Sequence, residues 1–296
     1  MVPAKRCCVL WMVVGAICAA AKTGDAADQS ARLRSAITFY ASFDQSTTGD
    51  FGQGDLSVWT RYDHPIERGK TTSERGADPG YVQVARQAAA GGGSLQFLDV
   101  IPRNGFLFFR AGDKLSVKQD GWGGAASVWI KTDPERMLKT PHCDPLQIVH
   151  KRYFDGAIWC DFDSDSPRDL RLGMFPSLGP GSHAAPTVPE SQQPIARAKD
   201  PPFGPDRWHH LALVWDRVDD PKQNAVAELY LDGSRIANLD KSPVRMQWNK
   251  DEVRFYIGAA LVGYLDEAAL FNRALSAAEV QTLFKDPALL ARFKRR

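Results

Sequence analysis

One segment near the C-terminal end constrains the fold most, because a strand pattern passes there almost directly into a capped helix. Residues 264–271 form a short, mostly apolar run of strand length. Ser276 can cap a helix, and Glu279, three positions later, completes a capping box ahead of an apolar face. We therefore expect a closing strand followed by one helix over residues 276–284.

Most of the remaining chain has the pattern of short strands joined by loops. Expected strands lie at residues 37–43, 81–84, 95–97, 106–109, 126–131, 146–153, 158–163, 208–216, 225–232 and 253–257. Residues 44–80 and 88–93 lack a sustained period, and eight prolines between residues 176 and 205 indicate one long loop. Many antiparallel strands with one small terminal helix predict an all-β jelly-roll sandwich.

Length and charge limit the number of domains and the classes of molecule that the chain can bind. A chain of 296 residues with 44% hydrophobic and 24% charged residues is typical of a globular protein. Single β-sandwiches commonly reach roughly 200–250 residues, so one domain with long loops is expected. The net charge is only +2, and basic residues cluster only in the tail at 292–296. This excludes the clustered positive charge that nucleic-acid binding requires.

The first residues have the pattern of an export signal. Lys5 and Arg6 precede an apolar run at residues 7–21 that ends in three alanines, which predicts a signal peptide over residues 1–21. This run is shorter than the roughly 20 apolar residues of a membrane-spanning helix, although an uncleaved anchor is the alternative. The mature chain is thus expected to be exported (secreted, periplasmic or at the cell surface) and to have no membrane span.

The mature chain is expected to have three parts. Residues 22–36 form a flexible lead-in, residues 37–285 the domain, and residues 286–296 a basic tail. Cys143 and Cys160 are the two cysteines beyond the signal. An oxidising compartment favours one disulfide between them. Two separate buried thiols are the alternative, because a bridge requires a Cα separation of about 4.4–6.8 Å.

Four segments resemble a known family in the same order along the chain. They are residues 124–132, 208–216, 229–233 and 263–280. Together they are similar to the laminin-G-like branch of the concanavalin A-like lectin/glucanase superfamily, over roughly residues 37–285. The resemblance implies a jelly-roll sandwich that binds more often than it catalyses.

A ligand face is predicted from a hairpin. Asp155-Gly156 readily supplies the positive φ angles of a type I′ turn, so the flanking strands should pair outward from it. One exposed face would then collect groups that suit a sugar, with stacking and hydrogen bonding: Trp159, Arg152, His150, Asp161 and Asp163. The alternative is a solvated face with cross-strand salt pairs.

Four other tryptophans lie near predicted strand ends or in loops. They are Trp59, Trp122, Trp208 and Trp248. A binding role and core or loop packing are both open to them.

A structural calcium ion is implied by the resemblance. In similar carbohydrate-binding jelly rolls an acidic residue after the first strand meets another on the closing strand, and Asp44 and Asp266 occupy matching places. Hard oxygen ligands there would clamp the sandwich. The alternative is that Asp44 opens a turn and Asp266 pairs with an arginine. His209 and His210 do not suggest a metal site, because neighbours on a strand point to opposite faces.

The enzyme motifs of the superfamily do not match. Retaining hydrolases of this fold resemble Glu-x-Asp-x-x-Glu or Glu-x-Asp-x-Glu, and residues 265–267 lack the flanking glutamates. Alginate-lyase-like members carry Gln-Ile-His, whereas residues 147–150 are one residue too long. We therefore predict an exported, non-catalytic lectin-like module that binds carbohydrate or an extracellular protein. The alternatives are a structural or protein-interaction domain and, more remotely, a polysaccharide lyase or glycoside hydrolase.

Overall fold

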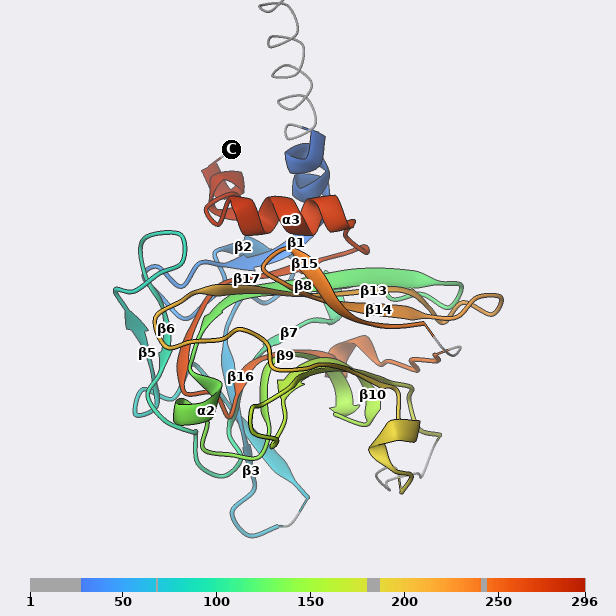
Figure 1. Ribbon diagram of the computed structural model, residues 1–296, viewed down its shortest axis with the longest axis horizontal. Helices are drawn as coiled ribbons and strands as arrows, with labels where there is room; N and C mark the ends of the chain where they lie inside the picture. Colours follow the sequence, from blue (N-terminus) through green and yellow to red (C-terminus); the bar gives the residue numbers. More distant parts are fainter. Residues whose placement is uncertain (1–27, 68, 180–186, 241–243, 296) are drawn as a thin grey trace, which may run out of the picture.

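The fold consists of two antiparallel sheets stacked face to face (Figure 1). The computed structural model describes residues 28–67, 69–179, 187–240 and 244–295. The predicted signal peptide at residues 1–21 lies outside these ranges. No helix within them is long and apolar enough to cross a membrane. The predicted all-β jelly-roll sandwich is confirmed.

The first sheet, sheet A, is centred on β8. Its order is β15 (Ser234–Leu239), β14 (Val226–Leu231), β13 (His209–Val218), β8 (Trp122–Lys131), β17 (Gly263–Phe271), β1 (Ile37–Ala41) and β2 (Phe51–Gly52). β6 (Ser94–Phe97) pairs with β17, and β5 (Val82–Ala85) pairs with β6.

The second sheet, sheet B, carries the longest hairpin. Its order is β12 (Ile195–Ala198), β11 (Leu170–Phe175), β10 (Asp155–Phe162), β9 (Cys143–Arg152), β16 (Arg254–Ala259), β7 (Phe106–Arg110), β3 (Trp59–Asp63) and β4 (Thr71–Arg75). Besides the helical residues 28–36, the helices are α2 (Pro134–Met137) and α3 (Ala277–Lys285), with 3₁₀ turns η1 (Gly112–Lys114), η2 (Glu190–Gln192), η3 (Lys250–Glu252) and η4 (Leu290–Arg295).

The main core lies between the sheets, where alternate side chains of each strand point inward. Phe39 of sheet A packs against Phe109 of sheet B with ring centroids 4.6 Å apart, and Trp215 is fully buried in the same core. Burying each such side chain contributes about 1.5–3 kcal/mol. This apolar contact holds the two layers together.

Helical segments from both ends of the chain cover the outer face of sheet A (Figure 1). α3 begins at the predicted capping box, in which Ser276 and Glu279 bond each other's backbone. The sequence predicted a flexible lead-in at residues 22–36, but residues 28–36 are helical and Leu33 is fully buried. Leu290, in the predicted tail, is buried in the same cluster. Apolar contact with sheet A explains why these two terminal segments are packed against the domain.

The turn predicted at Asp155-Gly156 is wrong. Arg152 pairs with Asp155, so the turn residues are Tyr153 and Phe154, and Trp159 pairs with Gln147. The Asp-Gly pair serves a different purpose here. A Cβ at Gly156 would lie 2.7 Å from the indole Nε1 of Trp248, so this glycine permits the close approach of a ring.

The predicted disulfide does not form, and Cys143 and Cys160 are free, buried thiols. Cys143 pairs with Phe162, whereas Cys160 pairs with Leu146. The two cysteines are therefore diagonal neighbours, and diagonal Cα atoms lie about 7–8 Å apart. That separation exceeds what a disulfide spans.

Candidate functional site

A row of large side chains crosses the outer face of sheet B. Direct backbone pairing aligns one residue from each of six neighbouring strands, and four of the six are aromatic: Trp59, Phe108, Tyr256, Gln147, Trp159 and Gly173. Neighbouring strands lie about 4.8 Å apart, so these residues form one row across the sheet.

Arginines lie over these rings. The distances from guanidinium carbon to ring centroid are 5.0 Å for Arg110 over Trp59, 5.4 Å for Arg254 over Phe108, 5.3 Å for Arg61 over Phe106 and 5.7 Å for Arg171 over Trp159. Distances below about 6 Å are typical of cation–π contacts. We call these residues together with Tyr256 the aromatic–arginine face.

The Trp159 end of this face is covered. Trp159 is 3% exposed, and its indole nitrogen donates to the backbone oxygen of Tyr153 over 2.7 Å. Its ring lies on Gly173, where a Cβ would come within 2.3 Å, and Leu178 and Ile195 pack nearby. The predicted exposure of Trp159 is therefore wrong, because Leu178, just after β11, and Ile195 of β12 pack against it.

The other end of the face is open. Trp59, Phe106 and Tyr256 are each partly exposed, and Arg110 is exposed at the end of β7. The indole of Trp59 donates to Asp55 over 3.1 Å, which fixes the plane of the ring. This part of the face offers ring surfaces and guanidinium donors to a ligand.

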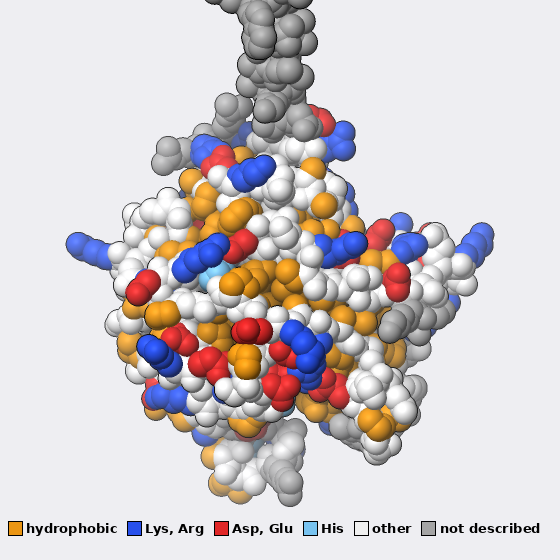
Figure 2. All heavy atoms as spheres, in the orientation of Figure 1, with side chains coloured by type: hydrophobic (Ala, Val, Ile, Leu, Met, Phe, Trp, Pro, Cys, Tyr) orange, Lys and Arg blue, Asp and Glu red, His pale blue; other side chains and the backbone are white. Residues whose placement is uncertain are grey.

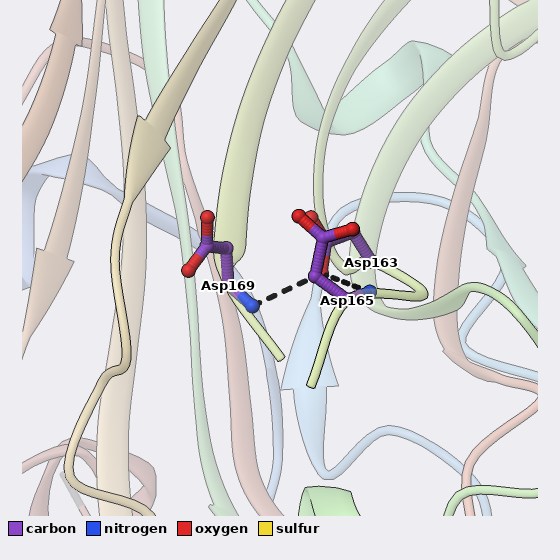
Figure 3. A group of neighbouring side chains, drawn as sticks. All are labelled: Asp163, Asp165 and Asp169. Atoms are coloured by element: carbon purple, nitrogen blue, oxygen red, sulfur yellow. Dashed lines mark hydrogen bonds between the residues drawn. The ribbon is translucent and has the colours of Figure 1, made fainter. Parts of the chain in front are cut away.

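Asp161 and Asp163 belong to an acidic and arginine-rich network beyond Trp159. Arg171 binds Asp161 through two nitrogens, at 2.9 and 2.5 Å. The oxygens of Asp163, Asp165 and Asp169 lie within 4.8 Å of one another (Figure 3). The Arg197 guanidinium bonds all three of those carboxylates, so it supplies the positive charge that a metal ion would otherwise bring.

The carboxyl group of Asp144 interacts electrostatically with that of Asp161. Burial raises the pKa of Asp144 well above its usual range, and the nearby charge of Asp161 adds to that shift. Burial also raises the pKa of Asp161, although Arg171 favours its charged form. The two carboxyl groups are thus close enough to influence one another, and their partners differ.

His150 and Arg152 do not join Trp159. The Nε2 of His150 accepts a hydrogen bond from the backbone of Asn249 over 3.1 Å, and burial lowers the pKa of this imidazole. Arg152 lies at the hairpin turn with its guanidinium over Phe154. Of the five residues predicted to form one exposed face, Trp159, Asp161 and Asp163 lie in one region, and all three are buried. The predicted face assumed a turn at Asp155-Gly156. The observed turn at Tyr153 and Phe154 changes which residues of β9 and β10 lie opposite each other.

Asp266 and Glu267 are buried carboxyl groups on β17. Asp266 accepts hydrogen bonds from the backbone of Ala89 (2.8 Å) and Glu267 (2.9 Å), and Tyr40 donates to Glu267 over 2.6 Å. Burial raises the pKa of Asp266 to about 8 and that of Glu267 to about 9. Within the described ranges neither forms a salt bridge, so the arginine partner considered for Asp266 is not observed.

Asp44 lies near this pair. Its Oδ1 accepts from the backbone of Gly93 over 2.9 Å, and its charge contributes to the raised pKa of Asp266. The loop at residues 88–93 therefore contacts both aspartates. This donor set, hard carboxylate oxygens with little compensating positive charge, fits a calcium ion chemically.

His209 and His210 project in opposite directions, as predicted. His209 lies 2.9 Å from Asp232 and packs against Phe203, whereas His210 packs against Trp129. Both rings are buried, and burial lowers the pKa of His210 to about 4. These contacts indicate a role in holding the sheet.

Surface charge is mixed. Figure 2 shows acidic and basic side chains interspersed over the visible side of the molecule, with hydrophobic side chains between them. No single sign dominates this view, which agrees with the net charge of +2.

Part of the chain matches a known family model, and its fold is similar to solved structures. Residues 162–281 match the family model described as the concanavalin A-like lectin/glucanases superfamily. No curated protein sequence matches the chain. Domain 4 of AbnA, a GH43 extracellular arabinanase from Geobacillus stearothermophilus solved with arabinotriose, is 17% identical, with a TM-score of 0.50. The match covers 84% of this chain and 98% of that domain.

The binding domain of botulinum neurotoxin serotype D is also similar in structure. It is 7% identical with a TM-score of 0.54, and the match covers 88% of this chain and 53% of that one. The present chain thus spans about half of the neurotoxin domain. At these identities the likeness concerns the fold alone.

Proposed function

We propose that the chain is an exported, non-catalytic module that binds carbohydrate, because its fold is a jelly roll and residues 162–281 match the model of the concanavalin A-like lectin/glucanases superfamily. The open end of the aromatic–arginine face is the proposed site. Export rests on the signal-like pattern at residues 1–21.

The observation that carries this proposal is the aligned row of rings with arginines on it. Trp59, Phe106 and Tyr256 offer partly exposed rings on adjoining strands. The apolar CH faces of sugars stack on such rings, and Arg61 and Arg110 can donate to hydroxyl or carboxylate oxygens. A glycan crossing the strands would meet these groups in succession.

A glycan array followed by calorimetry tests the proposal, with arabinan fragments among the probes. Trp59→Ala should weaken binding of any hit by about tenfold or more. Trp208→Ala is the matched control, because Trp208 is also partly exposed but contacts Tyr264 of sheet A. An array without reproducible hits would instead favour a protein-interaction domain.

A hydrolytic function is the second candidate, favoured by the Asp144 and Asp161 pair. Acid–base hydrolysis of glycosides uses two carboxyl groups, one of which has a raised pKa, and burial raises the pKa of Asp144, close to Asp161. Release of reducing ends or unsaturated uronates from polysaccharides, lost in Asp144→Asn, would establish catalysis. Binding without turnover would leave the non-catalytic proposal standing.

Calcium is proposed as a structural cofactor of this module. Asp44 and Asp266 would hold it, and an ion there would supply the positive charge that the buried Asp266 and the nearby exposed Asp44 lack. Thermal melting with calcium or with a chelator tests this proposal. An unchanged midpoint would contradict it.

A further inference from the structure

We propose a second ligand site at one end of the sandwich, which receives a carboxylate-bearing sugar unit of an acidic polysaccharide. This inference rests on the proposed carbohydrate-binding function and specifies the ligand. The site is a cavity of about 660 Å³, which we call the rim pocket. Ligand pockets in proteins typically measure about 300–1,000 Å³.

The floor of the rim pocket is apolar and firmly held. Trp248 and Met246 form it, with Val117 at one side. The indole of Trp248 donates to the backbone oxygen of Gly156 over 3.1 Å and packs on Trp122 at 5.1 Å between centroids. Trp248 is 9% exposed, so only a small part of the ring is available for contact with a ligand.

The polar wall of the pocket is predominantly cationic. Lys118, Arg245 and Lys250 line it, and Asp219 is the single acidic lining residue. Asp219 is occupied by the fold, because its carboxylate accepts from the Trp122 indole (2.9 Å) and from the backbone of Met246 (2.7 Å). Its negative charge is therefore engaged in building the floor. Its backbone oxygen also accepts from the Arg245 guanidinium over 2.6 Å, so Lys118 and Lys250 are the cationic groups left for a ligand.

Two of the polar groups are available to a ligand. The side chains of Lys250 and Gln119 make no hydrogen bond or ion pair with any residue that the structure describes. Lys118 lies 3.8 Å from the exposed Asp120, a weak surface contact. Two ammonium groups and an amide around an apolar floor suit a sugar ring that bears a carboxylate.

The rim pocket adjoins the aromatic–arginine face. Lys250 lies in η3, immediately before β16 starts with Arg254, and η1 follows β7, which ends with Arg110. The two turns are in close contact: a Cβ at Gly112 would lie 2.0 Å from the backbone oxygen of Lys250. A polysaccharide leaving the face past Arg110 and Arg254 would therefore reach the pocket.

Calorimetry with uronate oligomers (galacturonate, mannuronate and guluronate) and with their neutral methyl esters tests this inference. We expect the acidic oligomers to bind at least about tenfold more tightly than the esters. Lys118→Gln/Lys250→Gln should weaken binding of the acidic oligomers by about tenfold and leave the unfolding midpoint unchanged. Lys151→Gln, an exposed lysine on β9, is the control and should change neither quantity.

The outcomes separate this inference from the proposed function. Loss of binding in Trp59→Ala but not in the double-lysine variant would overturn the pocket and leave the face. The reverse result would support the pocket and overturn the face as the main site. Equal binding of the esters, or equal competition by inorganic phosphate, would overturn the assignment to an acidic sugar. Absence of binding to every oligomer would overturn the inference.

Discussion

The buried Asp266 carboxyl group provides the sharpest test of the physical argument. Its pKa is about 8 in the folded chain, against 3.8 when unperturbed, mainly because of burial. A carboxyl group with a raised folded-state pKa contributes stability that is present below about pH 4 and is lost as the pH rises towards 8. At about pH 7 the cost of protonating it is roughly 4 kcal/mol, from about 1.4 kcal/mol per pH unit.

Asp266→Asn removes this cost. In a chelator at about pH 7 we expect the variant to be more stable than the wild type by up to about 4 kcal/mol. Near pH 4 the two should be nearly equal. With calcium the order should reverse if an ion binds there, because only the wild type gains binding energy. Urea unfolding at several pH values measures these differences.

Asp206→Asn is the matched control, since Asp206 is exposed and should respond to neither pH nor calcium in this way. A less stable Asp266→Asn variant in chelator at every pH would refute the argument. In that case the hydrogen bonds to Ala89 and Glu267 would outweigh the cost of burial.

Three further predictions follow from the buried groups. His210 has a folded-state pKa of about 4 against 6.5, so stability should fall by about 3 kcal/mol as the pH drops through this interval, and His210→Gln should flatten the slope in urea titrations. Cys143 and Cys160 should react with a thiol reagent only after unfolding, giving two thiols without reductant in a chain that lacks residues 1–21; detection of no thiol would instead indicate a disulfide between them. Trp159→Ala should destabilise the fold by about 3–5 kcal/mol while the remaining folded protein keeps its ligand affinity. A variant with unchanged stability that no longer binds the ligand would contradict the burial of Trp159.

The sequence predicts strands well where apolar residues alternate and poorly where they do not. β3 and β4 were expected to be loop, because residues 71–75 are polar and lie at the edge of sheet B. The Asp-Gly dipeptide shows a second limit. At Asp232-Gly233 both residues have positive φ and join β14 to β15, whereas at Asp155-Gly156 only the glycine does. Contact with Trp248, distant in sequence, decides the second case.

The candidate face is a harder problem for sequence reasoning. Trp59, Phe108 and Tyr256 lie almost 200 residues apart at the extremes, and only strand order aligns them. The patterns around Phe108 and Tyr256 indicate strands but not which strands are neighbours, and Trp59 lies in a segment that was expected to be loop. The cation–π contacts have the same origin, since Arg110 reaches Trp59 across a strand boundary.

The placement of both chain ends has a practical consequence. Residues 28–36 and η4 lie together on the outer side of sheet A, opposite the exposed surface of sheet B (Figure 1). A tag, a solid support or a fused partner attached at either terminus would therefore leave Trp59 and its neighbours directed into solution. Biosensor measurements with terminally immobilised protein should consequently detect binding of large polymers with the same affinity as measurements in solution.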